Sequence, residues 1–239
     1  MDYATWSPVY RELLADFGFD AASDERARDE LADLTVAVDW DRLDATGRTV
    51  AVAGAGPSLV DPDHPDREGE LDRAREADAV FAASTAAAAL RDADVAVDCL
   101  VTDLDGCPET ARELTLAGTP VAVHAHGDNV PAVREWVPRL DADHVLATTQ
   151  ARPVAHVHNP GGFTDGDRAA FLADHLDAAQ LRFVGWDLDD PEVGPVKAKK
   201  LGWAERLLRW LERRRGERFA ILDGRRDRLD VDGFPLGDG

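Results

Sequence analysis

Lysine is almost absent from these 239 residues, and Lys197, Lys199 and Lys200 are the only three. Lys and Arg together number 27 against 47 Asp and Glu, which gives a formal net charge of -20. A charge of this sign repels the phosphate backbone, so we expect no nucleic-acid partner. The acids are interspersed among apolar runs and do not form blocks, which favours a folded surface adapted to molar salt over disorder.

Long hydrophobic runs are also missing, and cysteine is scarce. No stretch approaches about 18 consecutive apolar residues, so we expect no membrane span. Residues 1–6 have neither the basic nor the apolar region of a signal peptide, and we expect a cytoplasmic protein. Cys99 and Cys107 are the only cysteines, and their spacing fits neither a zinc knuckle nor a redox pair.

Short apolar runs alternate with segments of helical character from residue 49 onward. The expected strands are 49–53, 79–83, 95–101, 120–123, 144–147 and 182–185. The expected helices between the early strands are 71–77, 86–91, 109–117 and 130–140. This alternation predicts an α/β fold with a Rossmann-like, doubly wound and mostly parallel sheet. Such a sheet binds ligands at the carboxyl ends of its strands.

The two ends of the chain differ from this pattern. Residues 1–46 are acidic and helical, and we expect an N-terminal helical extension ahead of an α/β domain at 47–239. Near the other end, 199–215 predicts an Arg-rich amphipathic helix and 219–224 a final strand. The Asp- and Gly-rich residues 229–239 predict a loose tail.

A glycine-containing turn, Gly54-Ala55-Gly56-Pro57-Ser58, follows the first expected strand. Glycines let the backbone approach a phosphate, and a following helix N-terminus offers free N–H groups. The segment lacks the third glycine of the dinucleotide fingerprint and the Gly-Lys-Ser/Thr of a P-loop. It therefore predicts general nucleotide contact, with a tight turn that binds nothing as the alternative.

Two carboxylates, Asp103 and Asp105, directly follow the strand expected at 95–101. Side chains at i and i+2 leaving a strand point to the same side and can hold a hard cation together. Mg²⁺ prefers one or two carboxylates plus water and phosphate oxygens. The pair predicts a metal site, although such pairs are also common on acidic surfaces.

The next polar cluster, His124-Ala125-His126-Gly127-Asp128-Asn129, follows an apolar strand. Alternation along the strand places His124 and His126 on one face, and a His-x-His pair is typical of transition-metal sites. The cluster is equally suited to bind phosphate and to orient a second Mg²⁺ through Asp128. The sequence leaves both possibilities open.

Two further segments carry polar groups. Thr164 and Asp165 lie with Arg168 in a glycine-rich loop, where they either cap the following helix or recognise a ring or a phosphate. Asp187 follows the last expected strand and could accept hydrogen bonds from a heterocycle. The three lysines at 197–200 could neutralise triphosphate charge.

Taken in order along the chain, these motifs resemble the archaeal 6-hydroxymethyl-7,8-dihydropterin diphosphokinase (MptE-like) family. The segments that carry the resemblance are 54–59, 102–106, 124–129, 162–168, 185–187 and 197–201. The resemblance runs from about Val50 to Leu201. Asp103 and Asp105 are also similar to the metal-binding Gly-Asp-Phe-Asp-Ser segment of thiamine pyrophosphokinases, with Thr102 in place of its Gly and Gly106 in place of its Ser.

The resemblance implies a reaction of ATP with a small pterin alcohol that gives AMP and the pterin diphosphate. It implies Mg²⁺ on Asp103 and Asp105, with Asp128 as a third ligand. The other implied roles are nucleotide contact by Gly54, Gly56, Pro57, Ser58 and Asn129, charge balance by Lys197, Lys199 and His126, and contact with the pterin edge by Thr164, Asp165 and Asp187. The product would lead to tetrahydromethanopterin or folate-type cofactors, and the acidic composition resembles that of haloarchaeal cytosolic proteins.

Two other functions are compatible with the same motifs. A metal-dependent glycosyltransferase would use the paired acids and the glycine turn for a nucleotide sugar. A regulatory module would bind nucleotide without turnover. The sequence also leaves open a homo-oligomer. The N-terminal helices would either cover the site or form a subunit interface, and the sequence does not decide between the two.

Overall fold

The computed structural model describes residues 1–236, which form a six-stranded parallel sheet with the order β5-β4-β3-β2-β1-β6. The strands are β1 Thr49–Ala53, β2 Ala79–Ala83, β3 Cys99–Thr102, β4 Val121–Ala125, β5 Val145–Thr149 and β6 Gln180–Val184. Each lies at or close to a predicted apolar run, and the α/β prediction is confirmed. In the described chain, no helix combines the length and apolarity needed to cross a membrane.

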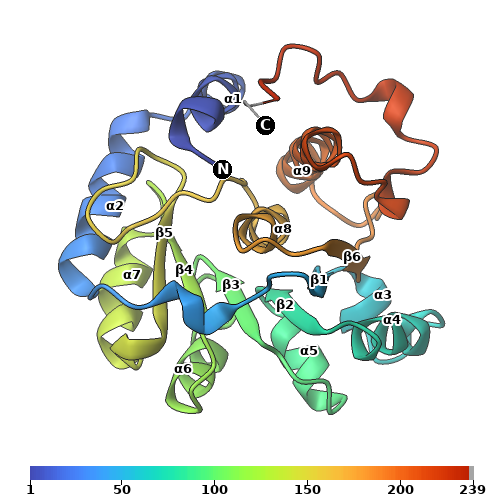
Figure 1. Ribbon diagram of the computed structural model, residues 1–239, viewed down its shortest axis with the longest axis horizontal. Coiled ribbons are helices and arrows are strands. Elements are labelled where there is room, and N and C mark those ends of the chain that lie inside the picture. The colour runs from blue at the N-terminus through green and yellow to red at the C-terminus, as the bar shows by residue number, and fades with distance from the viewer. Residues whose placement is uncertain (237–239) are drawn as a thin grey trace.

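Helices cover both faces of the sheet (Figure 1). They are α1 Tyr3–Phe17, α2 Ala21–Leu34, α3 Pro57–Val60, α4 Arg67–Arg75, α5 Ala86–Asp92, α6 Pro108–Leu116, α7 Val130–Trp136, α8 Asp165–His175 and α9 Pro195–Arg215. From β1 to β5 the chain always steps in one direction, so its right-handed crossovers place α4 to α7 on one face. The return from β5 to β6 reverses the direction and places α8 on the other face, together with α1 and α9.

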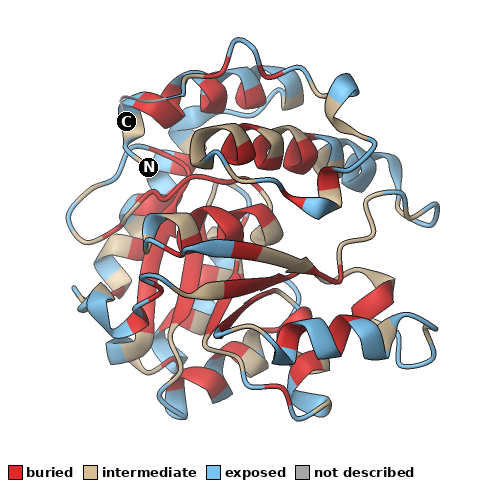
Figure 2. Ribbon diagram, turned by 45° about the vertical axis from the view of Figure 1, so that its right-hand side comes forward, coloured by how far each residue is buried: buried red, intermediate tan, exposed pale blue. Residues whose placement is uncertain are grey.

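The strand side chains alternate between two hydrophobic cores. Val50 and Val52 belong to the core under α1, α8 and α9, whereas Ala51 and Ala53 belong to the core under α4 to α7. Both sets are buried, as Figure 2 shows for the central strands. Strands covered on both faces need continuous apolar runs, which is why the sequence shows runs and not alternation.

The predicted N-terminal helices are present, and α1 is part of the main core. Trp6 is fully buried, with its ring centroid 6.3 Å from Phe171 of α8 and 6.2 Å from Trp210 of α9. Val9 and Leu13 of α1 are buried in the same core. We therefore propose that residue 46 marks where the sheet begins and does not separate two independently folding units.

The strand predicted at 219–224 is wrong, because this segment forms a 3₁₀ turn at Ala220–Leu222. The Phe219 N–H donates to the Glu212 carboxylate, and the Phe219 carbonyl accepts from Arg226. Side chains thus satisfy backbone groups that a strand would pair with a neighbouring strand.

The tail is also more ordered than its composition predicts. Val231 and Phe234 are buried, and the Phe234 ring centroid lies 5.6 Å from that of Trp210. The prediction of a loose tail is therefore wrong for residues 229–236. The rest of that prediction, 237–239, lies outside the described residues.

Candidate active site

A single cavity of about 810 Å³ lies at the carboxyl edge of the sheet. Residues that follow each of the six strands line it: 54–57, 84–85, 103 and 105, 126–128, 150, and 185–188. The opposite wall comes from residues 18–24 between α1 and α2, residues 163–168, and the first turns of α9. The sheet order reverses between β1 and β6, and parallel α/β sheets bind ligands at such a reversal.

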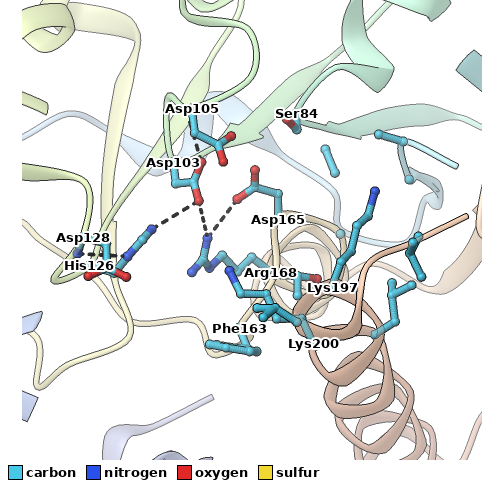
Figure 3. A pocket seen from close by; sticks show the side chains of 18 of the residues that line it. Ser84, Asp103, Asp105, His126, Asp128, Phe163, Asp165, Arg168, Lys197 and Lys200 are labelled. Atoms are coloured by element: carbon cyan, nitrogen blue, oxygen red, sulfur yellow. Dashed lines mark hydrogen bonds and ion pairs between the residues drawn. The ribbon is translucent and has the colours of Figure 1, made fainter. Parts of the chain in front are cut away.

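Three carboxylates converge in this cavity (Figure 3). Oxygen atoms of Asp103, Asp105 and Asp165 all lie within 4.8 Å of one another. The sequence predicted the first two as a pair but assigned Asp165 to the pterin edge. Asp128, the predicted third ligand, is exposed and lies beside His126, outside this cluster. The docking of α8 against the sheet, and not proximity in sequence, decides which third acid completes the group.

The carboxylates influence one another strongly. Burial and the neighbouring charge of Asp103 raise the pKa of Asp165 to about 7. Burial and the same charge also raise the pKa of Asp105. Burial alone would raise the pKa of Asp103, but His126 and Arg168 outweigh it and hold that pKa well below its ordinary value. Crowded like charges of this kind favour the binding of a cation.

Arg168 and His126 are basic side chains that contact the cluster. The Arg168 guanidinium lies 2.9 Å from an Asp165 oxygen and 3.9 Å from an Asp103 oxygen, and it is buried. His126 Nε2 lies 3.2 Å from an Asp103 oxygen. The sequence predicts ring or phosphate recognition as one alternative for the loop that contains Arg168, and the structure adds that this arginine contacts the predicted acid pair through Asp103.

Thr164 caps α8, as one of its two predicted alternatives requires. Its side chain and that of Asp167 form a capping box, and the buried Asp167 carboxylate accepts the N–H groups of Phe163 and Thr164. These bonds satisfy donors that a helix start leaves free. They also fix the direction in which Asp165 and Arg168 leave the helix.

Only part of the His124–Asn129 segment faces the cavity, and His124 and His126 do not form the predicted metal-binding pair. His124 is buried in β4, its Nδ1 lies 3.1 Å from Thr148 Oγ1, and its ring centroid is 6.4 Å from that of His126. Within residues 1–236, the acid cluster is the only group of three or more potential metal-ligating side chains whose ligand atoms lie this close together. The structure therefore favours the acid cluster over the His124–His126 pair as the place for a metal ion.

The sequence predicts that Asn129 contacts the nucleotide, but its side chain instead connects two of the loops that line the cavity. Its amide nitrogen donates to the carbonyls of Asp103 at 2.9 Å and His124 at 2.7 Å. Its amide oxygen accepts the His126 N–H at 2.9 Å. Asn129 is buried and holds the His126 loop against the Asp103 loop, so its effect on the cavity is indirect.

The glycine turn packs against the loop that follows β6. A Cβ atom at Gly54 would lie 2.8 Å from the Gly185 carbonyl, and one at Gly56 would meet both that carbonyl and the Asp187 carboxylate. Asp187 accepts the Ser58 N–H at 2.7 Å. A carboxylate already occupies the backbone donor that the sequence offered to phosphate, so phosphate contact at this turn is disfavoured by like charge.

The lysines divide between two faces of α9. Lys197 and Lys200 line the cavity, as Figure 3 shows. Lys199 instead donates to the Asp16 carbonyl at 2.7 Å and lies 3.0 Å from the Asp16 carboxylate. Lys199 therefore does not line the cavity, as its predicted role would require. Lys200 takes the position in the cavity that the sequence predicts for Lys199.

The sequence left open whether the N-terminal helices cover the site, and it did not indicate which of their residues would reach the cavity. Phe19, Ser23 and Asp24 all line the cavity. Asp24 is buried on the same side of α2 as Ala27 and Leu31, the i+3 and i+7 positions. An acid on the apolar face of an amphipathic helix is the one local signal that could have indicated it.

Comparison with known proteins agrees with this geometry. Residues 27–193 match the family model described as 6-hydroxymethylpterin diphosphokinase MptE-like, which is most of the chain. The chain belongs to this family. The span matched to the MptE-like family contains the acid cluster and Arg168, whereas Asp24 precedes it and Lys200 follows it.

Three archaeal relatives, each named 6-hydroxymethyl-7,8-dihydropterin pyrophosphokinase, align along most of the chain. The relative from Methanothermobacter thermautotrophicus is 40% identical over 230 residues, covering 89% of this chain and 96% of its own. The relative from Pyrococcus furiosus is 34% identical, covering 89% and 95%. The relative from Methanocaldococcus jannaschii is 32% identical, covering 89% and 96%. These MptE-like relatives give no support to the glycosyltransferase or the silent binding module.

Proposed function

We propose that this protein transfers a diphosphate group from ATP to 6-hydroxymethyl-7,8-dihydropterin, giving AMP and the pterin diphosphate. Membership of the MptE-like family and the names of the relatives support this reaction. The structural observation that carries the proposal is the convergence of Asp103, Asp105 and Asp165 within a cavity of about 810 Å³. Cavities of this size are typical of small-molecule sites.

The donor set fits Mg²⁺. Asp103, Asp105 and Asp165 offer only hard oxygen ligands, and their mutual crowding raises the pKa values of Asp105 and Asp165. We propose these three residues as the magnesium ligands, with Asp165 in place of Asp128. Bound Mg²⁺ would neutralise phosphate charge and polarise the phosphoryl oxygens.

The cationic side chains suit diphosphoryl transfer. The hydroxymethyl oxygen forms a bond to the β-phosphorus while the bond from that phosphorus to the bridging oxygen of AMP breaks. Charge develops on the phosphoryl oxygens, so donors fixed beforehand provide most of the stabilisation. Arg168 and His126 are held beside the acid cluster, and Lys197 and Lys200 reach the cavity from α9.

The two ends of the cavity differ in chemistry. At the glycine turn, Asp187 lies beside Gly56 and Ser58, and Leu188, Val193 and Val196 also line the cavity. We propose that this end takes the nucleoside, with its ring on the apolar side chains and its ribose hydroxyls donating to Asp187. Gly54, Gly56 and Pro57 would then contact the sugar and not a phosphate.

The other end is lined by Phe19, Gln150, Phe163 and Thr164. The Phe19 and Phe163 rings both lie beside Phe17, with centroids 5.2 and 5.1 Å from its own. A flat pterin ring needs an aromatic or apolar face together with hydrogen-bond partners at its edge. We propose this end as the pterin site, with Thr164 at the ring edge.

The setting of the reaction is also a proposal. We propose that the product feeds a tetrahydromethanopterin or folate-type cofactor and that the protein works in the cytoplasm of a salt-in halophile. The net charge of -20 with only three lysines supports the second part. The archaeal origin of the three relatives supports the first.

The deciding experiment measures AMP release from ATP in molar KCl, with and without Mg²⁺ and with and without the pterin alcohol. We expect AMP only when both are present. ADP in place of AMP would mean transfer of a single phosphoryl group and would overturn the proposal. Bound ATP with no product would favour nucleotide-sugar transfer or a silent module.

A further inference from the structure

We propose that Asp24, on the N-terminal helix α2, is a positioning residue that fixes two basic side chains of the active site, His126 and Arg168, at once. The inference rests on the proposed function of the cavity. Asp24 is 4% exposed, and its carboxylate accepts three hydrogen bonds, each 2.7 Å long. The donors are the Tyr10 hydroxyl, the Gln150 side-chain amide and the Gly127 backbone N–H.

The first path from Asp24 leads to His126. Gly127 directly follows His126, and its N–H donates to Asp24 Oδ1. A Cβ atom at Gly127 would lie 2.7 Å from that of Ser23, so the loop backbone is packed directly against α2. With Asn129 holding the loop from the other side, the His126 ring is set 3.2 Å from Asp103.

The second path leads to Arg168. The Gln150 amide nitrogen donates to Asp24 Oδ2, and its oxygen faces an Arg168 nitrogen at 3.4 Å. A carboxylate only accepts, so Asp24 determines which way the Gln150 amide is turned. The amide oxygen is thereby directed at Arg168, which in turn contacts Asp165 and Asp103.

Asp24 is an acid on an otherwise apolar side of α2, which it shares with Ala27 and Leu31. Its three hydrogen bonds offset the desolvation penalty of burying a carboxylate there. Burial, followed by the hydrogen bond to Asp24, raises the pKa of Tyr10, so the tyrosine hydroxyl remains a donor. The other two donors to Asp24 lead to the basic side chains beside the acid cluster, which a role in packing alone would not require.

The test is a double-mutant cycle of Asp24→Asn and Gln150→Glu, assayed by AMP release. In Asp24→Asn, the amide NH₂ takes the place of the carboxylate oxygen that accepts from the Tyr10 hydroxyl and the Gln150 amide. The hydroxyl can accept from it, but the Gln150 NH₂ loses its acceptor, and we expect kcat to fall by about 10- to 100-fold while KM for ATP changes less than about threefold. In Gln150→Glu alone, two carboxylates face each other, and we expect kcat to fall by a similar factor. The double variant restores one amide and one carboxylate, and we expect it to recover at least about tenfold in kcat. Glu25→Gln, an exposed neighbour on α2, should match the wild type.

A second measurement does not depend on turnover. Titration of Mn²⁺ into each variant should show weaker binding in Asp24→Asn and recovery in the double variant, because Asp103 and Asp165 lose their fixed neighbours. If the wild type releases no AMP but this pattern holds, only the proposed function fails. Folded Asp24→Asn with wild-type kcat and Mn²⁺ affinity, or a folded double variant without recovery of either, would overturn the role of Asp24.

Discussion

At the scale of single residues, the acid cluster illustrates a conflict between stability and function. Burial and the nearby charge of Asp103 raise the pKa of both Asp105 and Asp165. Crowding of like charges disfavours the folded protein without a cation, yet it favours the binding of a cation at this place. Residues of this kind are expected to reduce stability where they serve function.

Replacing Asp105 by Asn should separate these two effects. The variant keeps the shape of the side chain but removes a charge, so we expect kcat to fall at least about 100-fold while the melting temperature in EDTA stays level or rises. The matched control is Glu109→Gln, an exposed acid at the start of α6. Unchanged Mg²⁺-dependent turnover in Asp105→Asn would remove this residue from the proposed metal site.

His124, buried in β4 behind the acid cluster, gives the protein a further pH dependence. Burial lowers the pKa of His124 well below its ordinary value, and the charges of Arg168 and His126 act in the same direction, opposed by Asp103. The unfolded chain binds a proton near pH 6.5, while the folded chain does not. The stabilisation that results is complete above that pH and is lost progressively as the pH falls below it.

We therefore expect the unfolding free energy of the wild type to fall by about 1 kcal/mol more than that of His124→Asn between pH 7.5 and 5.5. Asn keeps a polar group near Thr148 but does not titrate. Urea denaturation at constant KCl and in EDTA measures both slopes. Equal losses in the two proteins would show that another group accounts for the pH dependence.

At the scale of elements, the rotation of α9 about its axis decides which lysines reach the cavity. Lys197 and Lys200 are three positions apart and therefore lie on one side of the helix. Lys199 projects from another side toward α1, where it pairs with Asp16 and lies over the Phe17 ring at 4.5 Å. The sequence predicted a lysine cluster, but a cluster of adjacent residues cannot all face one ligand.

The two lysines form a matched pair for experiment. We expect Lys200→Ala to lower kcat/KM for ATP by at least about tenfold, because a cation at the phosphates is lost. Lys199→Ala should leave kcat/KM within about twofold and reduce stability by no more than about 1 kcal/mol, since its ion pair is half exposed. Steady-state kinetics and thermal unfolding of both variants check this, and the reverse ranking would contradict the assignment.

At the scale of the whole molecule, the excess of acid opposes compactness. The net charge of -20 is spread over a chain whose arginines are engaged in ion pairs along α9 and the C-terminal segment. Self-repulsion among the remaining acids acts over the Debye length, which falls from about 10 Å at 0.1 M salt to about 3 Å at 1 M. Salt should therefore favour the folded state.

Raising KCl from 0.1 M to 2 M should raise the melting temperature by at least about 5 °C, because screening reduces repulsion more in the compact state than in the unfolded chain. NaCl at equal ionic strength should act similarly if screening is the cause. A melting temperature that is constant or falls with salt would contradict the proposed adaptation to molar salt.

The sequence by itself determined the six parallel strands (though not the absence of the strand predicted at 219–224), the edge of the sheet where the cavity lies, and the proximity of Asp103 and Asp105. These features depend on local pattern, because buried parallel strands are apolar runs and their carboxyl ends share one edge. The family resemblance was visible for the same reason, since its motifs lie in those strand-end loops.

Only the tertiary structure decided which distant groups join them. Asp165 replaces Asp128 because α8 returns across the sheet, Lys200 replaces Lys199 because of how α9 is rotated, and Asp24 enters because α2 packs against the Gly127 loop. Each of these depends on how one helix docks against the sheet. Docking is set by packing between residues far apart in the chain, and a local pattern along the sequence does not record it.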